Sequence, residues 1–149
     1  MDQDEKWMKF AVEEAIQAKN KGEVPVGAII IQDNIIISKA HNQSIIENDA
    51  TAHAEIQAIR LAGNVLKNYR MNNASMYVTL EPCPMCLGAI MHARLERVVF
   101  GAYDSKSGAC GTCENLMQSK CFNHSISIKS GVLEKECSKL LRDFFQLLR

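Results

Sequence analysis

A strand, helix and strand unit in the middle of the chain constrains the fold more than any other feature of the sequence. Residues 75–80 form an apolar run that predicts a strand, and Pro82 and Pro84 follow where a helix would begin, because proline fits the first turn. The helix extends over residues 84–94, and the β-branched run at residues 97–100 predicts the next strand. Two strands joined through one helix are typical of a parallel crossover, so the sequence predicts an α/β fold.

Hydrophobic periodicity predicts the elements that precede this unit. Residues 4–21 and 52–67 have apolar residues at helical spacing. Residues 26–31 and 35–37 predict the strands of a hairpin, since the intervening Asp33-Asn34 pair tolerates a tight turn. The apolar stripes of the two helices comprise Met8, Ala11, Val12, Ala15 and Ile16 in the first, and Ile56, Ile59 and Leu61 in the second.

The last third of the chain combines a long loop with one more strand and helix. Residues 101–123 lack periodicity and are rich in Gly, Ser, Cys and Asn, which predicts a long loop of the kind that often carries function. A short strand around residues 126–128 and an amphipathic helix from Leu133 to Phe145 follow. We therefore expect a three-layer α/β/α domain, residues 1–149, with helices on both faces of a mixed sheet of about five strands.

Size, charge and cysteine content limit the classes of protein to which the chain can belong. A length of 149 residues suits one domain, and 17 basic against 17 acidic side chains give no net charge to attract nucleic acid, so binding to nucleic acid would have to rely on a local basic patch and a shaped pocket. The charged N-terminus does not resemble an export signal, and the longest apolar runs are too short to cross a membrane as helices. We therefore expect a cytoplasmic protein whose six cysteines are reduced thiols or metal ligands.

Two short clusters at predicted helix starts carry the residues that can bind a metal ion. Cys83 and Cys86 have the C-x-x-C spacing at which two sulfurs can bind one tetrahedral zinc ion, and a helix N-terminus favours their thiolate forms. His53 supplies a third ligand. Three protein ligands leave one coordination position for water, which is typical of catalytic zinc. We therefore expect one zinc ion per chain, which makes hydroxide available near neutral pH.

Glu55 is the predicted general acid and base of this site. His53 and Glu55 are two residues apart, so in a regular helix their side chains would point about 200° from each other. Both can face one site only if they lie in the first turn, with the metal beyond the helix end. Glu55 then stays off the metal but close to its bound water, where a carboxylate can move protons.

Each of these motifs alone is a weak signal. A His and a Glu in a first helical turn can be ordinary surface residues, and a C-x-x-C pair can be redox-active, half of a structural zinc site, or two buried thiols. Together, H-x-E followed by P-C-x-x-C at helix starts is typical of zinc deaminases. A non-catalytic zinc module that binds nucleic acid is the alternative from another class, and it has no need of Glu55.

Beyond these motifs, the sequence resembles the bacterial tRNA-specific adenosine deaminases over nearly its whole length. The matching positions are residues 23–28 (EVPVGA), Asn42, Asp49, residues 51–56 (TAHAEI), residues 77–86 (YVTLEPCPMC), residues 97–102 (RVVFGA), Asp104, Lys106, Gly108, residues 123–124 and residues 143–145. The resemblance implies a cytidine-deaminase-like fold, a homodimer, and deamination of the wobble adenosine of a tRNA anticodon loop to inosine. The chain departs from the family pattern at Ser44 and Ala50, where proline is common.

The resemblance also implies roles for individual residues. The zinc ligands are expected to be His53, Cys83 and Cys86, with Glu55 as the catalytic residue. The substrate-binding residues are expected to be Asn42 at the flipped base and Asp104, Lys106 and Phe145 along the flanking nucleotides. Two of these have simpler interpretations, because Asn42 could cap a turn and Phe145 could belong to the core with Phe144.

Two alternatives remain open at this point, one for the metal and one for the substrate. A second, structural zinc site can be drawn from Cys110, Cys113, Cys121 and His124, although the resemblance does not require it and the cysteines could instead be an oxidisable pair. A deaminase of a free nucleobase or nucleoside, of the guanine or cytosine type, would share the same zinc core.

Overall fold

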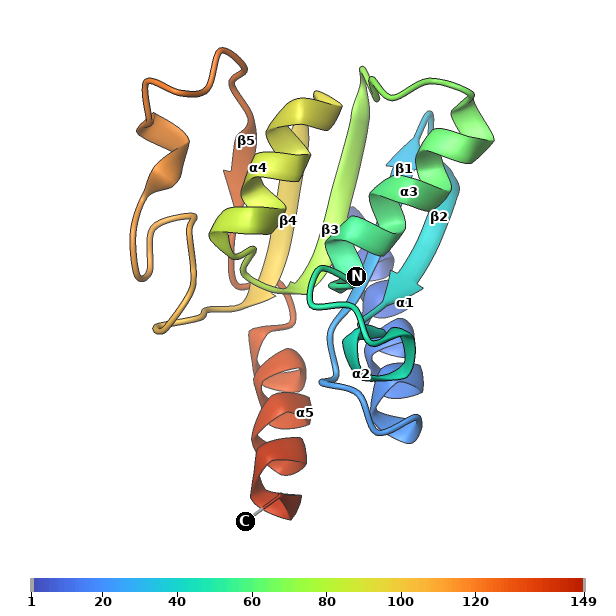
Figure 1. Cartoon of the computed structure of the whole chain (residues 1–149), viewed down its shortest axis with the longest axis vertical. Coiled ribbons are helices and arrows are strands. Elements are labelled where there is room, and N and C mark those ends of the chain that lie inside the picture. The colour runs from blue at the N-terminus through green and yellow to red at the C-terminus, as the bar shows by residue number, and fades with distance from the viewer. Residues whose placement is uncertain (1, 149) are drawn as a thin grey trace.

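A five-stranded mixed sheet forms the centre of the computed structural model, which describes residues 2–148. The strands are β1 (Gly27–Gln32), β2 (Ile35–His41), β3 (Ala74–Leu80), β4 (Arg97–Ala102) and β5 (Ser127–Lys129). Their order in the sheet is β2-β1-β3-β4-β5, with β1 antiparallel to β2 and β3, and with β3, β4 and β5 parallel (Figure 1). The predicted parallel crossover is therefore present between β3 and β4.

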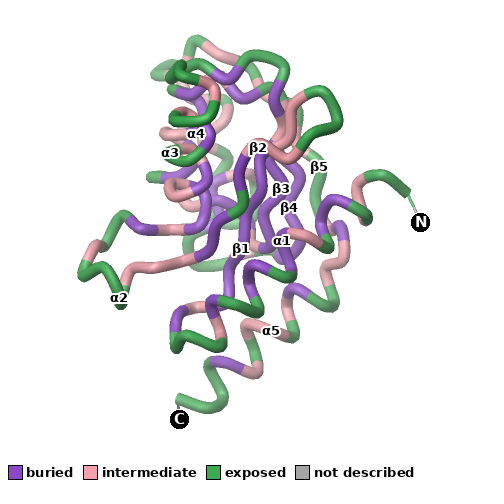
Figure 2. The backbone as a smooth tube through the Cα atoms, turned by 90° about the vertical axis from the view of Figure 1, so that its right-hand side faces the viewer, coloured by how far each residue is buried: buried purple, intermediate pink, exposed green. Residues whose placement is uncertain are grey.

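Helices cover both faces of the sheet. The helices α3 (Ala54–Leu66) and α4 (Pro84–Ala93) lie on one face, and α1 (Gln3–Asn20) and α5 (Glu134–Leu147) lie on the other (Figure 1). Two short helices occur in connecting segments, α2 (Ser44–Glu47) and the 3-10 helix η1 (Leu116–Gln118). In Figure 2 the buried strands lie between the two helical layers, which confirms the expected three-layer α/β/α architecture.

The strands alternate between two apolar clusters because successive side chains point to opposite faces of a sheet. In β1, Ala28 and Ile30 pack with α3 and α4, whereas Ile29 between them packs with α1 and α5. In β3, Val78 and Tyr77 divide in the same way. Both faces of the central strands are therefore buried, which explains their nearly continuous apolar sequences.

Most predicted elements are confirmed, with differences at their edges. The hairpin turn places Asp33 and Asn34 at φ of 53° and 60°, the left-handed conformation that a two-residue turn of this kind requires. Within the predicted apolar stripes, Ile16 and Leu61 are not buried, because their side chains are 42% and 47% exposed. The helix α2 was not predicted, because four residues carry no helical period.

The topology brings two helix N-termini to the same end of the sheet. The helix α3 begins after β2 and the long connection through α2, while α4 begins directly beyond the carboxyl end of β3, and the two helices contact each other. The helix α5 extends past this edge of the sheet (Figure 1). Crevices at the carboxyl ends of parallel strands are common ligand sites in α/β folds. No helix within residues 2–148 is long and apolar enough to cross a membrane.

Candidate active site

The three predicted metal ligands converge where α3 and α4 begin. His53 is the N-cap residue of α3, Cys83 is the N-cap residue of α4, and Cys86 lies in the first turn of α4. The Nδ1 atom of His53 lies 3.6 Å from Sγ of Cys83 and 3.5 Å from Sγ of Cys86. All three ligand atoms lie within 4.8 Å of one another, so these residues could hold a metal ion.

These distances match the edges of a tetrahedral zinc site. With ordinary Zn–S and Zn–N bond lengths, a tetrahedral zinc ion holds a sulfur and a nitrogen ligand about 3.6 Å apart. Hydrogen bonds from Cys86 and from His53 lower the pKa of the Cys83 thiol to about 4, so Cys83 favours the thiolate form that metals bind. The donor set and the two nitrogen–sulfur distances therefore fit a zinc ion.

Glu55 lies beside this group but outside it. It is the second residue of α3, and its side chain is buried, with 4% of its surface exposed. Burial raises the pKa of the Glu55 carboxyl to about 7, because water no longer stabilises the charged form. A carboxyl with this pKa can both accept and donate a proton near neutral pH, as general acid and base catalysis requires.

Asn42 connects the end of β2 to the first turn of α3. Its Oδ1 accepts a hydrogen bond from the N–H of Ala54, the first residue of α3, at 2.7 Å. His53 occupies the N-cap position but makes no capping bond itself, because its ring faces the cysteines. Since Oδ1 is used in this bond, the Nδ2 group remains available as a hydrogen-bond donor, and Asn42 also lines the cleft above the site.

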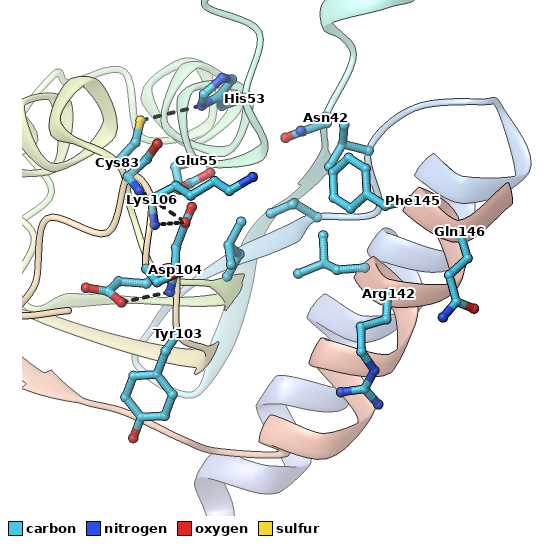
Figure 3. Close-up of a pocket in the computed structure, with 17 residues that line it drawn as sticks. Asn42, His53, Glu55, Cys83, Tyr103, Asp104, Lys106, Arg142, Phe145 and Gln146 are labelled. Atoms are coloured by element: carbon cyan, nitrogen blue, oxygen red, sulfur yellow. Dashed lines mark hydrogen bonds between the residues drawn. The ribbon is translucent and has the colours of Figure 1, made fainter. Parts of the chain in front are cut away.

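A cleft of about 1020 Å³ lies over His53, Glu55 and Cys83. Figure 3 shows its two sides, with Tyr103, Asp104 and Lys106 on one and the α5 residues Arg142, Phe145 and Gln146 on the other. The remaining lining residues are Val24, Val26, Asn42, Leu80, Glu81, Ser105, Ser107 and Leu141. The cleft therefore has a polar, metal-binding floor and walls that carry basic and aromatic side chains.

The structure brings the predicted substrate-binding residues to this cleft. Asp104 forms a tight turn, in which its Oδ1 accepts hydrogen bonds from the N–H groups of Lys106 and Ser107 at 3.0 and 3.1 Å. Phe145 is 47% exposed on the cleft side of α5, whereas Phe144 is 9% exposed and packs edge-to-face against it. The core position thus belongs to Phe144, and Phe145 is free to contact a ligand.

Several lining residues were missed from the sequence. Arg142 and Gln146 could have been found, because Arg142 lies three positions before Phe145 and Gln146 lies four positions after Arg142 on the same amphipathic helix. Glu81 lies in the matched segment 77–86 but received no role there, and Tyr103 gave no usable signal, since its place depends on how the irregular loop folds back on the sheet.

The alternative of a second zinc site is wrong for the described residues. Among residues 2–148, His53, Cys83 and Cys86 form the one group of His, Cys, Asp and Glu that converges on a point. His124 instead makes a hydrogen bond from Nε2 to the backbone oxygen of Leu95 at 2.6 Å, and Cys113 and Cys121 are exposed.

Comparison with known proteins shows the family of the chain. Residues 2–149 match the model of the MafB19-like deaminase family. A tRNA-specific adenosine deaminase of Bacillus subtilis (strain 168) is 50% identical over 149 residues, which cover 100% of this chain and 92% of that protein. The chain belongs to the tRNA-specific adenosine deaminases.

Solved structures agree with this assignment of the deaminase. A structure from a study of A-to-I editing by tRNA:A34 deaminases at the wobble position has a TM-score of 0.89 and 39% identity, covering 91% of this chain and 99% of that one. A guanine deaminase from Bacillus subtilis has a TM-score of 0.67 and 34% identity, covering 100% of this chain and 94% of that one. The same fold therefore occurs in a structure from a study of tRNA:A34 deaminases and in a guanine deaminase.

Proposed function

We propose that this deaminase converts adenosine to inosine at the wobble position of a tRNA anticodon loop, with water as the second substrate and ammonia as the second product. The single observation that carries the chemistry is the buried carboxyl of Glu55 on the cleft floor, beside three metal-binding side chains that it does not join. The choice of substrate is supported by the full-length similarity to tRNA-specific enzymes.

Zinc is the metal that we propose for His53, Cys83 and Cys86, with one ion per chain. Two sulfur ligands and one imidazole nitrogen at tetrahedral spacing are typical of zinc sites, and three protein ligands leave one position open. When bound, the ion supplies a Lewis acid that makes water nucleophilic near neutral pH. The residues of the chain then have to orient the base and move the protons.

Glu55 is the group that we assign to proton transfer. In its ionised form a carboxylate oxygen takes a proton from the attacking water, while the new C–O bond forms at C6 of the base. The same oxygen then gives that proton to N1 of the ring. The carboxylate then takes a second proton from the new hydroxyl group at C6 and gives it to the exocyclic nitrogen, the C6–N bond breaks as the C6 carbonyl forms, and ammonia leaves. Glu55 ends in its starting form, so the reaction balances as adenosine plus water giving inosine plus ammonia.

The walls of the cleft fit an RNA loop that enters from outside. We propose that the Nδ2 group of Asn42 donates to the flipped base and that Asp104, Lys106 and Phe145 contact the flanking nucleotides. Phe145 offers an exposed ring on which a base can stack, and Lys106 is exposed for a phosphate. Bases of a single-stranded loop are already partly unstacked, which lowers the cost of extrusion.

We also propose that residues 1–149 act as one domain, as a cytoplasmic homodimer in which α4 and the neighbouring loops form the interface. Met85, in the first turn of α4, is 37% exposed and supports a contact there. Light scattering should give twice the chain mass of 16.6 kDa. A monomer that is fully active at assay concentration contradicts the dimer.

The test of the proposed function is inosine formation in a synthetic anticodon stem-loop with adenosine at the wobble position. The same loop with guanosine at that position, free adenosine, cytidine and guanine serve as comparison substrates. We expect deamination of the adenosine stem-loop alone. Equal turnover of free adenosine, or faster turnover of guanine or cytidine, refutes the tRNA substrate and leaves the zinc chemistry standing.

A further inference from the structure

A buried carboxylate next to the metal-binding cysteines has no part in the chemistry described above. Glu81 follows β3, two residues before Cys83, and is 1% exposed. Its Oε1 accepts a hydrogen bond from the N–H of Asp104 at 3.1 Å. Its Oε2 accepts hydrogen bonds from the N–H groups of Cys110 at 3.0 Å and Thr112 at 3.2 Å. No Lys or Arg within residues 2–148 forms an ion pair with it, so its hydrogen bonds all come from the backbone of one loop.

We propose that Glu81 is a positioning residue, which fixes residues 103–107, here called the rim segment, relative to the metal ligand Cys83. Every residue of the rim segment lines the cleft. The loop is bonded to Glu81 near both ends of this stretch, at Asp104 and at Cys110. Because Glu81 and Cys83 belong to the same short segment, the carboxylate couples the wall of the cleft to its metal-binding floor. The proposal rests on the proposed function for the identity of the RNA that this wall meets.

Two further contacts show that the loop lies directly on this segment. The N–H of Ala109 donates to the backbone oxygen of Pro82 at 2.9 Å. A Cβ atom added at Gly108 would collide with the backbone oxygen of Asp104, and it would lie 2.5 Å from Cδ and 2.6 Å from Oε1 of Glu81, so that position accepts no side chain without moving the loop or the carboxylate. The rim segment therefore has little freedom as long as Glu81 is in place.

The three donors require a carboxylate at this position. A carboxylate offers acceptors on both oxygens, whereas glutamine of nearly the same shape offers an NH₂ group in place of one oxygen. In Glu81→Gln that NH₂ group would face at least one backbone N–H, and the corresponding hydrogen bond would be lost in a buried place. Within the rim segment, the turn made by Asp104 with Lys106 and Ser107 would remain, so the segment should shift as a unit.

The test compares zinc-loaded wild-type protein with Glu81→Gln by zinc content, amide hydrogen exchange and kinetics on the adenosine stem-loop. We expect one zinc per chain in both proteins. We expect the amides of Asp104, Cys110 and Thr112 to exchange about tenfold faster in the variant, because the loop opens more easily. The KM for the stem-loop should rise about tenfold while kcat changes less than about threefold, since the floor of the site is intact.

A matched control is Glu23→Gln. Glu23 is also 1% exposed, and its carboxylate accepts hydrogen bonds from the backbone N–H groups of Ile45 and Ile46 at 3.1 and 2.7 Å. This variant loses the same kind of bond elsewhere, so exchange of the three loop amides should stay at the wild-type rate. A second variant, Gly108→Ala, keeps Glu81 but places a methyl group against both its carboxylate and the backbone oxygen of Asp104, and it should speed exchange of the same amides and raise KM in the same way.

The outcomes separate the proposal from its alternatives. Wild-type exchange and KM in a zinc-loaded Glu81→Gln protein overturn it, and so does a variant that loses zinc while the loop amides stay protected, since Glu81 would then serve the metal site alone. If Glu81→Gln does not fold, Gly108→Ala decides the matter, and normal exchange and KM in that variant overturn the proposal. If the wild-type protein does not deaminate the stem-loop, the proposed function fails, while amide exchange still decides whether Glu81 holds the rim segment.

Discussion

Replacing Asn42 by alanine removes the acceptor that caps the metal-binding end of α3. The N–H of Ala54 donates to Oδ1 of Asn42 at 2.7 Å, and Ala54 is fully buried. His53, the N-cap residue by position, makes no capping bond that could replace it. In Asn42→Ala the N–H of Ala54 therefore has no side-chain acceptor, and water reaches it only if the first turn opens.

The expected loss of stability follows from this single bond. Removing an N-cap acceptor costs about 1 kcal/mol in most helices, with a range of roughly 0.5–2 kcal/mol. Leaving a buried N–H unpaired costs roughly 1–3 kcal/mol. Both figures describe the same interaction, so the free energy of unfolding should fall by about 1.5 kcal/mol. For a chain of this length the Tm should fall by about 3–6 °C.

The assay is urea unfolding at one fixed concentration of free zinc, because metal binding to the folded state adds to apparent stability. The matched variant is Asn42→Asp, which keeps an oxygen acceptor at the helix N-terminus, where a negative charge is favourable. It should retain most of the wild-type stability. Both variants lack the Nδ2 donor, so both should lose catalytic efficiency on the adenosine stem-loop.

Two results would refute this reasoning. If Asn42→Ala unfolds within about 0.3 kcal/mol of wild type, or if Asn42→Asp is destabilised as much as the alanine variant, then the bond to Ala54 does not cap the helix. If Asn42→Asp keeps wild-type catalytic efficiency, the Nδ2 group does not serve the base. Stability and turnover are measured separately, so one half of the prediction can fail without the other.

Three further predictions concern the site and the sheet. Glu55→Gln should keep its zinc and its fold but lose activity by at least about a hundredfold, because the amide cannot carry protons, and near-normal turnover would assign proton transfer to another group. Cys83→Ala should lose zinc in metal analysis, and full occupancy would contradict the ligand assignment. The Arg97 guanidinium, followed by Lys129, holds the pKa of Asp4 well below its usual range. This stabilises the fold above the unfolded-state pKa of about 3.9 and is lost as pH falls through the lower folded-state value. Asp4→Asn should therefore lower the free energy of unfolding by about 1–3 kcal/mol at pH 7. The difference between variant and wild type should narrow below about pH 4. A difference that stays constant with pH contradicts the prediction.

The elements that could be predicted from the sequence are those that local chemistry determines. The turn at Asp33 and Asn34 needs two residues that tolerate positive φ, and the helix α4 begins at Pro84 because proline suits a first turn. By contrast, α2 is stabilised by Glu23, which binds the N–H groups of Ile45 and Ile46 from more than twenty residues away. No local pattern contains that information.

The site also contains parts that local sequence determines and parts that contacts between distant residues determine. The floor was predictable, because His53, Glu55, Cys83 and Cys86 lie in first helical turns, whose geometry depends on neighbouring residues. The resemblance pointed to Asp104, Lys106 and Phe145, but the arrangement of the wall was not predictable, because its loop is bonded to Glu81, which lies 23 to 31 positions earlier in the chain. Hydrophobic periodicity does not predict the conformation of a loop whose backbone N–H groups bond to one buried carboxylate.

Two of the metal-binding residues occupy N-cap positions, so their side chains do not satisfy the first N–H group of the helix that follows. The chain meets this requirement in a different way at each helix. An N-cap side chain normally accepts a hydrogen bond from the first turn, but His53 and Cys83 direct theirs toward each other. At the first position of α3, the N–H of Ala54 is satisfied by Asn42 from the neighbouring strand end. At the first position of α4, Pro84 has no N–H to satisfy. Metal ligands at the helix ends therefore leave no unpaired N–H at the first position of either helix, and Asn42 also lines the cleft, so the stability of this end of α3 and the proposed contact with the base depend on one side chain.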